Sequence, residues 1–157
     1  MSVRLSQISD LEGINALLHQ VAAVHHNGRP DLFRAGCKKY TDEELCILIE
    51  QEQNTRPIFV YEEDGVVLGY AFCMLLDYSE EHVLTPIKSL YIDDLCVDER
   101  CRGKHIGAKL FDFVKAYARD IGCYNVTLNV WACNPGALKF YEKCGMQVQK
   151  MGMETIL

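Results

Sequence analysis

The sequence lacks the features that mark membrane, secreted and nucleic-acid-binding proteins. No apolar run approaches the roughly 18 to 20 residues that span a bilayer, and the first residues contain no apolar signal core. The formal net charge of −6 argues against non-specific binding to nucleic acids or anionic membranes. We therefore expect a cytoplasmic protein that binds neither, with an acidic surface that weakly favours cationic partners.

The chain contains eight cysteines, a high number for its length. No two of them have the spacing of a CxxC motif. Without a signal for an oxidising compartment, they are interpreted as reduced thiols that serve as small apolar side chains. His25 and His26 are adjacent, so a helix would point them to different sides rather than toward one ion. The sequence therefore predicts neither a disulfide framework nor a metal site.

The chain also lacks repeats, low-complexity tracts and linkers, which predicts one domain over residues 1–157. Ser9 with Glu12, and Thr41 with Glu44, have the spacing of capping boxes at helix starts. Apolar periodicity predicts two further helices, from Ile106 to a stop at Gly122 and over 135–143. Strands are expected over 3–5, 58–61, 66–76, 88–97, 126–131 and 146–157. The order β-α-α-β-β-β-α-β-α-β predicts an α/β fold with a mixed central sheet flanked by helices.

A basic loop follows the strand 88–97 and becomes the start of an amphipathic helix. Unpaired N–H groups and the helix dipole suit an anion there, above all a pyrophosphate. A solvated basic turn is the alternative, and the loop alone leaves both interpretations open. The cationic residues are Arg100, Arg102, Lys104, His105 and Lys109.

Two motifs resemble the GNAT superfamily of N-acetyltransferases. RGKHIG at 102–107 is similar to the family's acetyl-CoA pyrophosphate loop, Q/R-x-x-G-x-G/A, although His105 replaces its first loop glycine. NPGALKFYEKCG at 134–145 is similar to the second signature, N-x-x-A-x-x-F-Y-x-x-x-G. The resemblance implies a single-domain GNAT fold and direct transfer of an acetyl group from acetyl-CoA to an amine. It looks closest to bacterial single-domain members and to diamine and polyamine acetyltransferases.

The same resemblance assigns the residues that bind the cofactor. Backbone groups of Leu95, Cys96 and Val97 would hold the pantetheine arm and polarise the thioester, with the Cys96 side chain packing rather than attacking. Asn134 would bind the arm, and Ala137 would leave room for it. The pyrophosphate would bind Arg102, Gly103, Lys104, His105, Ile106, Gly107 and Ala108.

Acetylation of an amine requires a base for the ammonium and an acid for the departing thiolate. The resemblance implies that Tyr141 is the acid, with core packing as the alternative. It implies that Asp93 is the base, since 90–95 is similar to the Tyr-x-Glu-Asp run of polyamine acetyltransferases. Strand alternation predicts Asp93 and Asp94 on opposite faces. A structural ion pair of Asp93 with Arg102 or Lys88 stays open, as does proton transfer to water or Asp94.

The acceptor is left open by these features. A small primary amine is favoured, and a protein N-terminus or lysine is the alternative. A CoA-binding module without catalysis is a third possibility. The acceptor pocket is expected between the first two helices and the segment 27–33, and a homodimer is possible.

Overall fold

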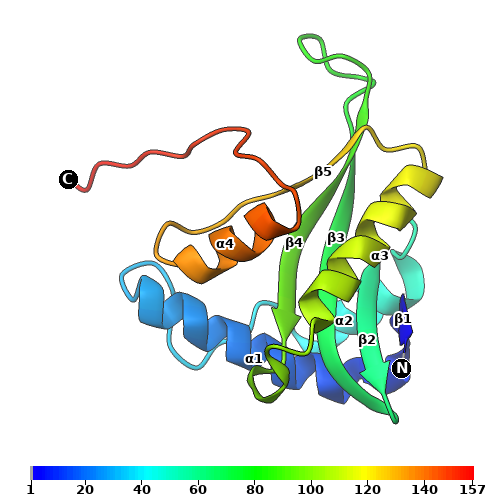
Figure 1. Ribbon diagram of the computed structural model, residues 1–157, viewed down its shortest axis with the longest axis vertical. Helices are drawn as coiled ribbons and strands as arrows, with labels where there is room; N and C mark the ends of the chain where they lie inside the picture. Colours follow the sequence, from blue (N-terminus) through cyan, green and yellow to red (C-terminus); the bar gives the residue numbers. More distant parts are fainter. Residues whose placement is uncertain (1) are drawn as a thin grey trace.

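Five strands form one sheet in the order β1-β2-β3-β4-β5 (Figure 1) in the computed structural model, which describes residues 2–157. The first four strands pair antiparallel and β5 runs parallel to β4, so the expected mixed sheet is confirmed. The strands are β1 Ser2–Leu5, β2 Ile58–Glu63, β3 Val66–Asp77, β4 Lys88–Val97 and β5 Asn125–Leu128.

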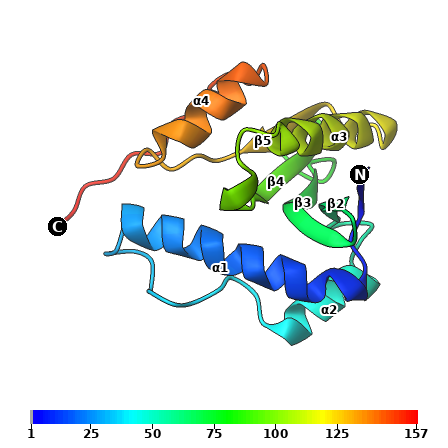
Figure 2. The ribbon, with the colours of Figure 1, turned by 60° about the horizontal axis from the view of Figure 1, so that its bottom comes forward.

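Helices cover both faces of the sheet (Figure 2), with α1 and α2 on one side and α3 and α4 on the other. Each face buries its own apolar cluster, one including Leu17, Leu45 and Tyr70 and the other including Phe59 and Leu110. The helices are α1 Leu11–Gly28, α2 Asp42–Gln51, α3 Ile106–Asp120 and α4 Pro135–Lys143, with short 3-10 turns at Ile8–Asp10 and Glu99–Cys101.

Several local signals act as the sequence predicts. Thr41 and Glu44 form the reciprocal capping box at the start of α2, with N–H···O distances of 3.2 and 2.8 Å. The hairpin between β2 and β3 turns through Asp64 and Gly65, both with positive φ. Gly122 follows the end of α3 with φ 79°, a conformation that favours glycine.

The capping box predicted at Ser9 is wrong. Ser9 lies inside the 3-10 turn Ile8–Asp10, and α1 begins only at Leu11. The reason is a competing carboxylate: Asp10 accepts a 2.8 Å hydrogen bond from the Gln7 N–H and a 2.7 Å bond from Arg4 of β1. This ion pair ties the helix start to the edge of the sheet.

The strand predicted over 146–157 is also wrong, because residues 147–157 are extended but pair with no strand among the described residues. β5 ends at Leu128 rather than at Trp131, and its four residues are half-buried. Periodicity identifies extended chain, but it does not show whether a neighbouring strand is present.

Gly69 in β3 provides a test of this packing. A Cβ there would lie 3.0 Å from the Cys96 carbonyl oxygen and 3.0 Å from Leu110 Cδ1. Because a backbone oxygen cannot move aside cheaply, Gly69→Ala should lower the free energy of unfolding by about 1–3 kcal/mol, measured by urea denaturation. Gly152→Ala is the matched control, since its Cβ would meet nothing within 4 Å. Equal stability of the two variants would contradict the close packing of β3, β4 and α3.

Candidate active site

The pairing of β4 with β5 stops halfway along β4. Ser89–Ile92 lie opposite Asn125–Leu128, and the chain after β5 then moves away toward α4 (Figure 1). On its other edge β4 stays paired with β3 as far as Val97. The segment Asp93–Val97 therefore has an edge without a strand partner among residues 2–157. Backbone groups on such an edge need other partners, and Leu95, Cys96 and Val97 lie in it.

A β-bulge lies where the two strands part. Phe72 of β3 is opposite Asp94, but the next residue, Cys73, is opposite Ile92, so Asp93 is an extra residue in β4. A bulge shifts the alternation of side chains by one position. The prediction that Asp93 and Asp94 lie on opposite faces is therefore wrong, and both carboxylates point to the side of α1 and α2.

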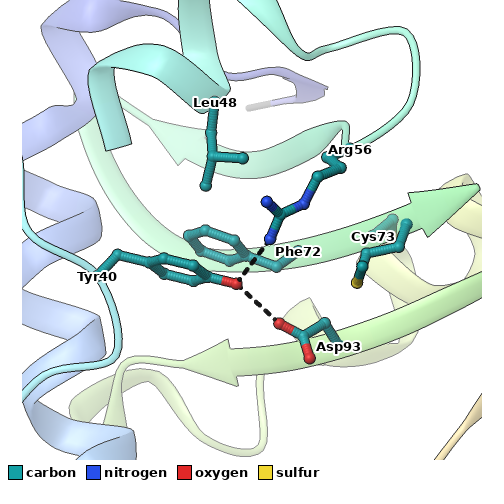
Figure 3. Close-up of a pocket in the computed structure, with 7 residues that line it drawn as sticks. Tyr40, Leu48, Arg56, Phe72, Cys73 and Asp93 are labelled. Atoms are coloured by element: carbon teal, nitrogen blue, oxygen red, sulfur yellow. Dashed lines mark hydrogen bonds between the residues drawn. The ribbon is translucent and has the colours of Figure 1, made fainter. Parts of the chain in front are cut away.

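Asp93 is held by a hydrogen-bonded network (Figure 3). Its Oδ2 accepts bonds from Lys39 Nζ at 2.6 Å and from the Tyr40 hydroxyl at 3.0 Å. Arg56 donates in turn to the Tyr40 hydroxyl at 3.3 Å. The ion pair of Asp93 is thus with Lys39, and neither of the pairings considered from the sequence is the one observed. The Tyr40 ring stacks on Phe72, which fixes this network against the core.

Asp94 occupies a more buried position. It accepts a 2.7 Å hydrogen bond from the Tyr70 hydroxyl. Burial raises the pKa of Asp94 above its usual range, although Tyr70, Lys39 and His25 favour the charged form. The carboxylate acts on its surroundings in return, since burial and then the charge of Asp94 raise the pKa of Tyr141. The charge of Asp94 therefore helps to keep the Tyr141 phenol in its protonated form.

Tyr141 approaches this region from α4. Its ring lies 6.0 Å from Phe111 and 5.0 Å from Phe140, and the residue packs against the cluster on the α3 face. With a raised pKa the phenol keeps its proton at neutral pH, as a general acid must. Packing and a proton-donating role are compatible in this position.

Cys96 has the properties of a packing residue. Burial, and next the charge of Asp94, raise the pKa of its thiol to about 12. Its Sγ lies 3.7 Å from the Leu17 carbonyl oxygen in the core of the α1 face. Because the thiolate is the nucleophilic form, a thiol with this pKa is poorly suited to attack.

The loop after β4 has the backbone geometry of an anion site. Gly103 and His105 have φ values of 84° and 60°, both in the left-handed region, and His105 is the N-cap of α3. Left-handed residues in such a turn create a concave set of N–H groups beside a helix N-terminus. Arg102, Lys104 and His105 are exposed here. Histidine thus adopts the conformation that glycine would supply in the family motif.

Arg100 contributes less to the cationic loop than its sequence position indicates. It donates to Asp98 from Nε at 3.0 Å and from Nη2 at 2.6 Å. These hydrogen bonds lower the pKa of Asp98 to about 2, so the pair is charged and internally neutralised at neutral pH. Its role is to fix the turn that leads from β4 to α3.

The second motif borders the same region. Gly107 at the start of α3 faces α4, and a Cβ there would lie 3.1 Å from Phe140 Cζ. Asn134 caps α4, because its Oδ1 accepts a 3.1 Å bond from the Ala137 N–H. Ile106 is buried, whereas Gly107 and Ala108 are partly accessible. The two motifs therefore meet where the start of α3 packs against α4.

An aromatic cluster near the two carboxylates was missed by the sequence analysis. His25 of α1 stacks on Phe33 at 5.0 Å, and Phe33 meets the edge of Trp131 at 5.2 Å. His25 is also close enough to Asp94 for its charge to act on that carboxyl. The three residues are far apart in the sequence, and only folding brings the loop after β5 against the end of α1.

Residues 2–157 contain no group of three or more His, Cys, Asp or Glu side chains arranged to hold a metal ion. Within the same residues, no helix has both the length and the apolar character needed to cross a membrane.

Residues 23–146 match the sequence profile of the acetyltransferase (GNAT) family. The chain belongs to this family. It is an acetyltransferase with the GNAT fold, as the two motifs indicated, and the family uses acetyl-CoA as acetyl donor.

Solved structures and curated proteins agree with this assignment. A mutant of the BH1408 protein from Bacillus halodurans has a TM-score of 0.93 and 28% identity, covering 100% of this chain and 99% of that chain. Glucosamine-6-phosphate N-acetyltransferase from Arabidopsis thaliana has a TM-score of 0.73 and 28% identity, covering 99% and 97%. In sequence, the glucosamine 6-phosphate N-acetyltransferase of Arabidopsis thaliana is 39% identical to this chain over 66 residues. This match spans 42% of this chain and 42% of the relative.

The left-handed conformation of His105 leads to a stability prediction. Because glycine adopts positive φ without a Cβ clash, His105→Gly should raise the free energy of unfolding by up to about 1 kcal/mol in urea denaturation. Lys104→Gly in the same loop is the control, since Lys104 does not have positive φ, and it should be neutral or destabilising. If His105→Gly were the more destabilising of the two variants, the prediction would be wrong. The histidine side chain would then stabilise the fold by more than the strain of its positive φ costs.

Proposed function

We propose that this acetyltransferase moves the acetyl group of acetyl-CoA to a primary amine of a small molecule, by direct attack and without an acetyl-enzyme. The observation that carries the proposal is the unpaired edge Asp93–Val97, which leads directly into the left-handed turn at His105. An extended ligand with an anionic end fits an open strand edge that is followed by such a turn. Carboxylates and a neutral phenol, Tyr141, lie beside the same edge.

The cofactor is proposed to lie along β4 and to end at α3. Backbone groups of Leu95, Cys96 and Val97 bind the pantetheine arm and polarise the thioester. Arg102, Gly103, Lys104 and His105 surround the pyrophosphate, and the N–H groups of Ile106, Gly107 and Ala108 point along the helix dipole toward it. On the other side, Asn134 and Ala137 border the arm at the start of α4.

The residues then divide the proton transfers between them. A base takes a proton from the substrate ammonium, and the free amine attacks the thioester carbonyl carbon. Backbone N–H groups at the β4 edge stabilise the developing oxyanion. When the carbon–sulfur bond breaks, Tyr141 donates its proton to the thiolate. The former amine nitrogen loses its second proton to solvent as the amide forms, and the phenolate regains a proton from solvent.

Asp94 is our preferred base among the two adjacent carboxylates. Its pKa is raised by burial, which makes it a stronger base, and it is in electrostatic contact with Tyr141. Asp93, the residue assigned from sequence, has its charge compensated by Lys39 at 2.6 Å. We propose that Asp93 instead holds Lys39 and Tyr40 in place, and it remains the alternative base that the variants below distinguish.

A small acceptor is supported by the surroundings of the carboxylates. His25, Phe33 and Trp131 join the end of α1, the following loop and the loop after β5 on the acceptor side. The relatives named as glucosamine 6-phosphate N-acetyltransferases act on a small amino sugar by name. We propose an acceptor of this size class rather than a protein N-terminus or lysine.

An acceptor screen tests this function. Thiol release from acetyl-CoA is followed while polyamines, amino sugars, amino-sugar phosphates, aminoglycosides and peptides are added in turn. Saturable release with one class of small amine supports the proposal. Thiol release only with peptides would contradict the proposal and indicate a protein acetyltransferase. Tight acetyl-CoA binding without thiol release for any amine would indicate a CoA-binding module without catalysis.

Tyr141→Phe separates an acid from a packing residue, because it keeps the ring and removes the proton. Loss of a general acid should lower kcat by about 10²–10⁴-fold. Acetyl-CoA affinity, measured by calorimetry, should change little because the proton matters mainly in the transition state. Phe140→Leu is the control on the same helix, expected to affect stability rather than the chemical step. Normal pre-steady-state release of CoA by folded Tyr141→Phe would rule out the acid role.

Asp94→Asn and Asp93→Asn identify the base. A base acts when deprotonated, so the wild-type kcat/KM should fall as pH drops through the raised pKa of Asp94. Asp94→Asn should lose about 10²-fold or more at neutral pH and lose this acidic limb, with partial recovery at high pH where the amine is already free. Asp93→Asn should mainly raise KM. The reverse pattern would restore Asp93 as the base, and no effect from either would assign the proton to water.

A further inference from the structure

A lysine of the chain itself lies against one of the two carboxylates beside the unpaired edge of β4. Lys39, in the loop between α1 and α2, donates from Nζ to Asp93 Oδ2 at 2.6 Å. Its charge also acts on Asp94, where it favours the ionised carboxylate. A primary ammonium therefore lies close to both residues that are considered as the base. This is the same chemical group that an amine acceptor would bring to the site.

The residue after Lys39 holds this ammonium in place. The Tyr40 ring stacks on Phe72 of β3 with centroids 5.3 Å apart, and its hydroxyl donates to the same Asp93 oxygen at 3.0 Å (Figure 3). The Lys39 Nζ lies 5.7 Å from the centroid of the Tyr40 ring, within the range of a cation–π contact. A ring packed on the core thus keeps the Lys39 amine at the carboxylate.

The ion pair of Lys39 is accessible rather than buried. The Lys39 side chain is 46% exposed and that of Asp93 is 16% exposed. Exposed ion pairs contribute little to stability, so the amine can leave the carboxylate at small cost. Three other lysines pair with carboxylates that lie outside the site: Lys38 with Asp42, Lys88 with Asp77 and Lys115 with Asp112.

The proposed position of the thioester is within reach of this side chain. The backbone proposed to polarise the thioester includes Leu95, which is two residues beyond Asp93 in β4. Two residues of a strand span about 7 Å. The lysine amine lies at the end of a flexible four-carbon stem, so a change of rotamer can move it over a distance of this order.

We propose that Lys39 is an acetylation site of the enzyme itself, modified by acetyl-CoA within its own chain when no small amine is present. The inference rests on the proposed function and uses the same site. Asp93 takes a proton from the Lys39 ammonium, to which it is already hydrogen-bonded. The free Nζ attacks the thioester carbonyl carbon, a carbon–nitrogen bond forms, and the carbon–sulfur bond breaks.

The remaining protons balance as in transfer to a free amine. Tyr141 protonates the departing thiolate, and the Lys39 nitrogen loses its second proton to solvent as the amide forms. Asp93 then releases its proton to solvent, and the Tyr141 phenolate regains one. The products are CoA and a neutral acetyl-lysine. Because the amide is neutral, Asp93 loses its cationic partner, and thiol release without an acceptor should stop at one equivalent per chain.

Mass spectrometry tests the site. The protein is incubated with acetyl-CoA alone, and its acetylated lysines are mapped before and after. Lys39 should be modified about 100-fold faster or more than Lys88, because acid–base catalysis is available only at the site. Lys88 is the matched control for uncatalysed acetylation, since its side chain is 48% exposed. Equal rates at Lys39 and Lys88 would overturn the proposal.

Variants separate catalysis by the site from simple accessibility. Lys38→Arg is the control beside Lys39, because Lys38 donates to Asn15 at 2.6 Å and to Asp42 at 2.5 Å instead. Lys39 should still be acetylated in Lys38→Arg. Tyr141→Phe should slow acetylation of Lys39 by about 10²-fold or more and leave that of Lys88 unchanged. Equal acetylation of Lys39 with and without the Tyr141 hydroxyl would contradict modification by this site.

The order of the reaction tests whether one chain modifies itself. The first-order rate constant for Lys39 should be independent of protein concentration. A rate constant that rises in proportion to protein concentration would indicate transfer between chains and overturn the proposal. An unmodified Lys39 in protein that acetylates a small amine of the screen would also overturn it, while the proposed function would stand. Acetylation of neither Lys39 nor any amine would contradict both.

Discussion

The short pairing between β4 and β5 is the constraint around which this structure is organised. Four residue pairs, Ser89–Ile92 with Asn125–Leu128, join the two strands before they part. Buried backbone polar groups are costly when unpaired, so the segment Asp93–Val97 needs another partner on that edge. The bulge at Asp93 occurs where the strands separate, and it turns both acidic side chains toward α1 and α2. The open edge and the position of the two proposed acid–base carboxylates therefore have one structural origin.

The two apolar clusters keep that edge in place from opposite sides. α1 and α2 hold the face that contains Tyr70 and Phe72, whose neighbours are Asp94 and Tyr40. α3 packs closely enough on β3 and β4 that Gly69 has no room for a side chain. This places the start of α3, with its left-handed N-cap, at the end of the open edge. The proposed site for the pyrophosphate and the thioester requires a rigid sheet and a rigid helix start, because the reacting groups must be held in a fixed geometry.

Local chemistry made much of the fold predictable, and long-range contacts explain the rest. The capping box at Thr41, the hairpin at Asp64 and the motifs around α3 and α4 depend on residues close in sequence. The bulge depends on how β3 and β4 align, so alternation alone placed Asp93 and Asp94 wrongly. The partners Lys39, Tyr40 and Tyr70 come from other elements, and no spacing rule connects them to the carboxylates. In the same way, the sequence indicated a strand over 146–157 but could not indicate whether a neighbouring strand would pair with it.

Hydrogen exchange of the backbone amides, with and without acetyl-CoA, tests the central claim most directly. If the cofactor replaces the missing strand, acetyl-CoA should slow exchange in peptides that cover 93–97 and 103–109. Peptides from α2, which lies on the acceptor side away from the phosphate loop, should change much less. Protection confined to other parts of the chain, or no protection at saturating acetyl-CoA, would contradict the assignment of the open β4 edge as the cofactor site.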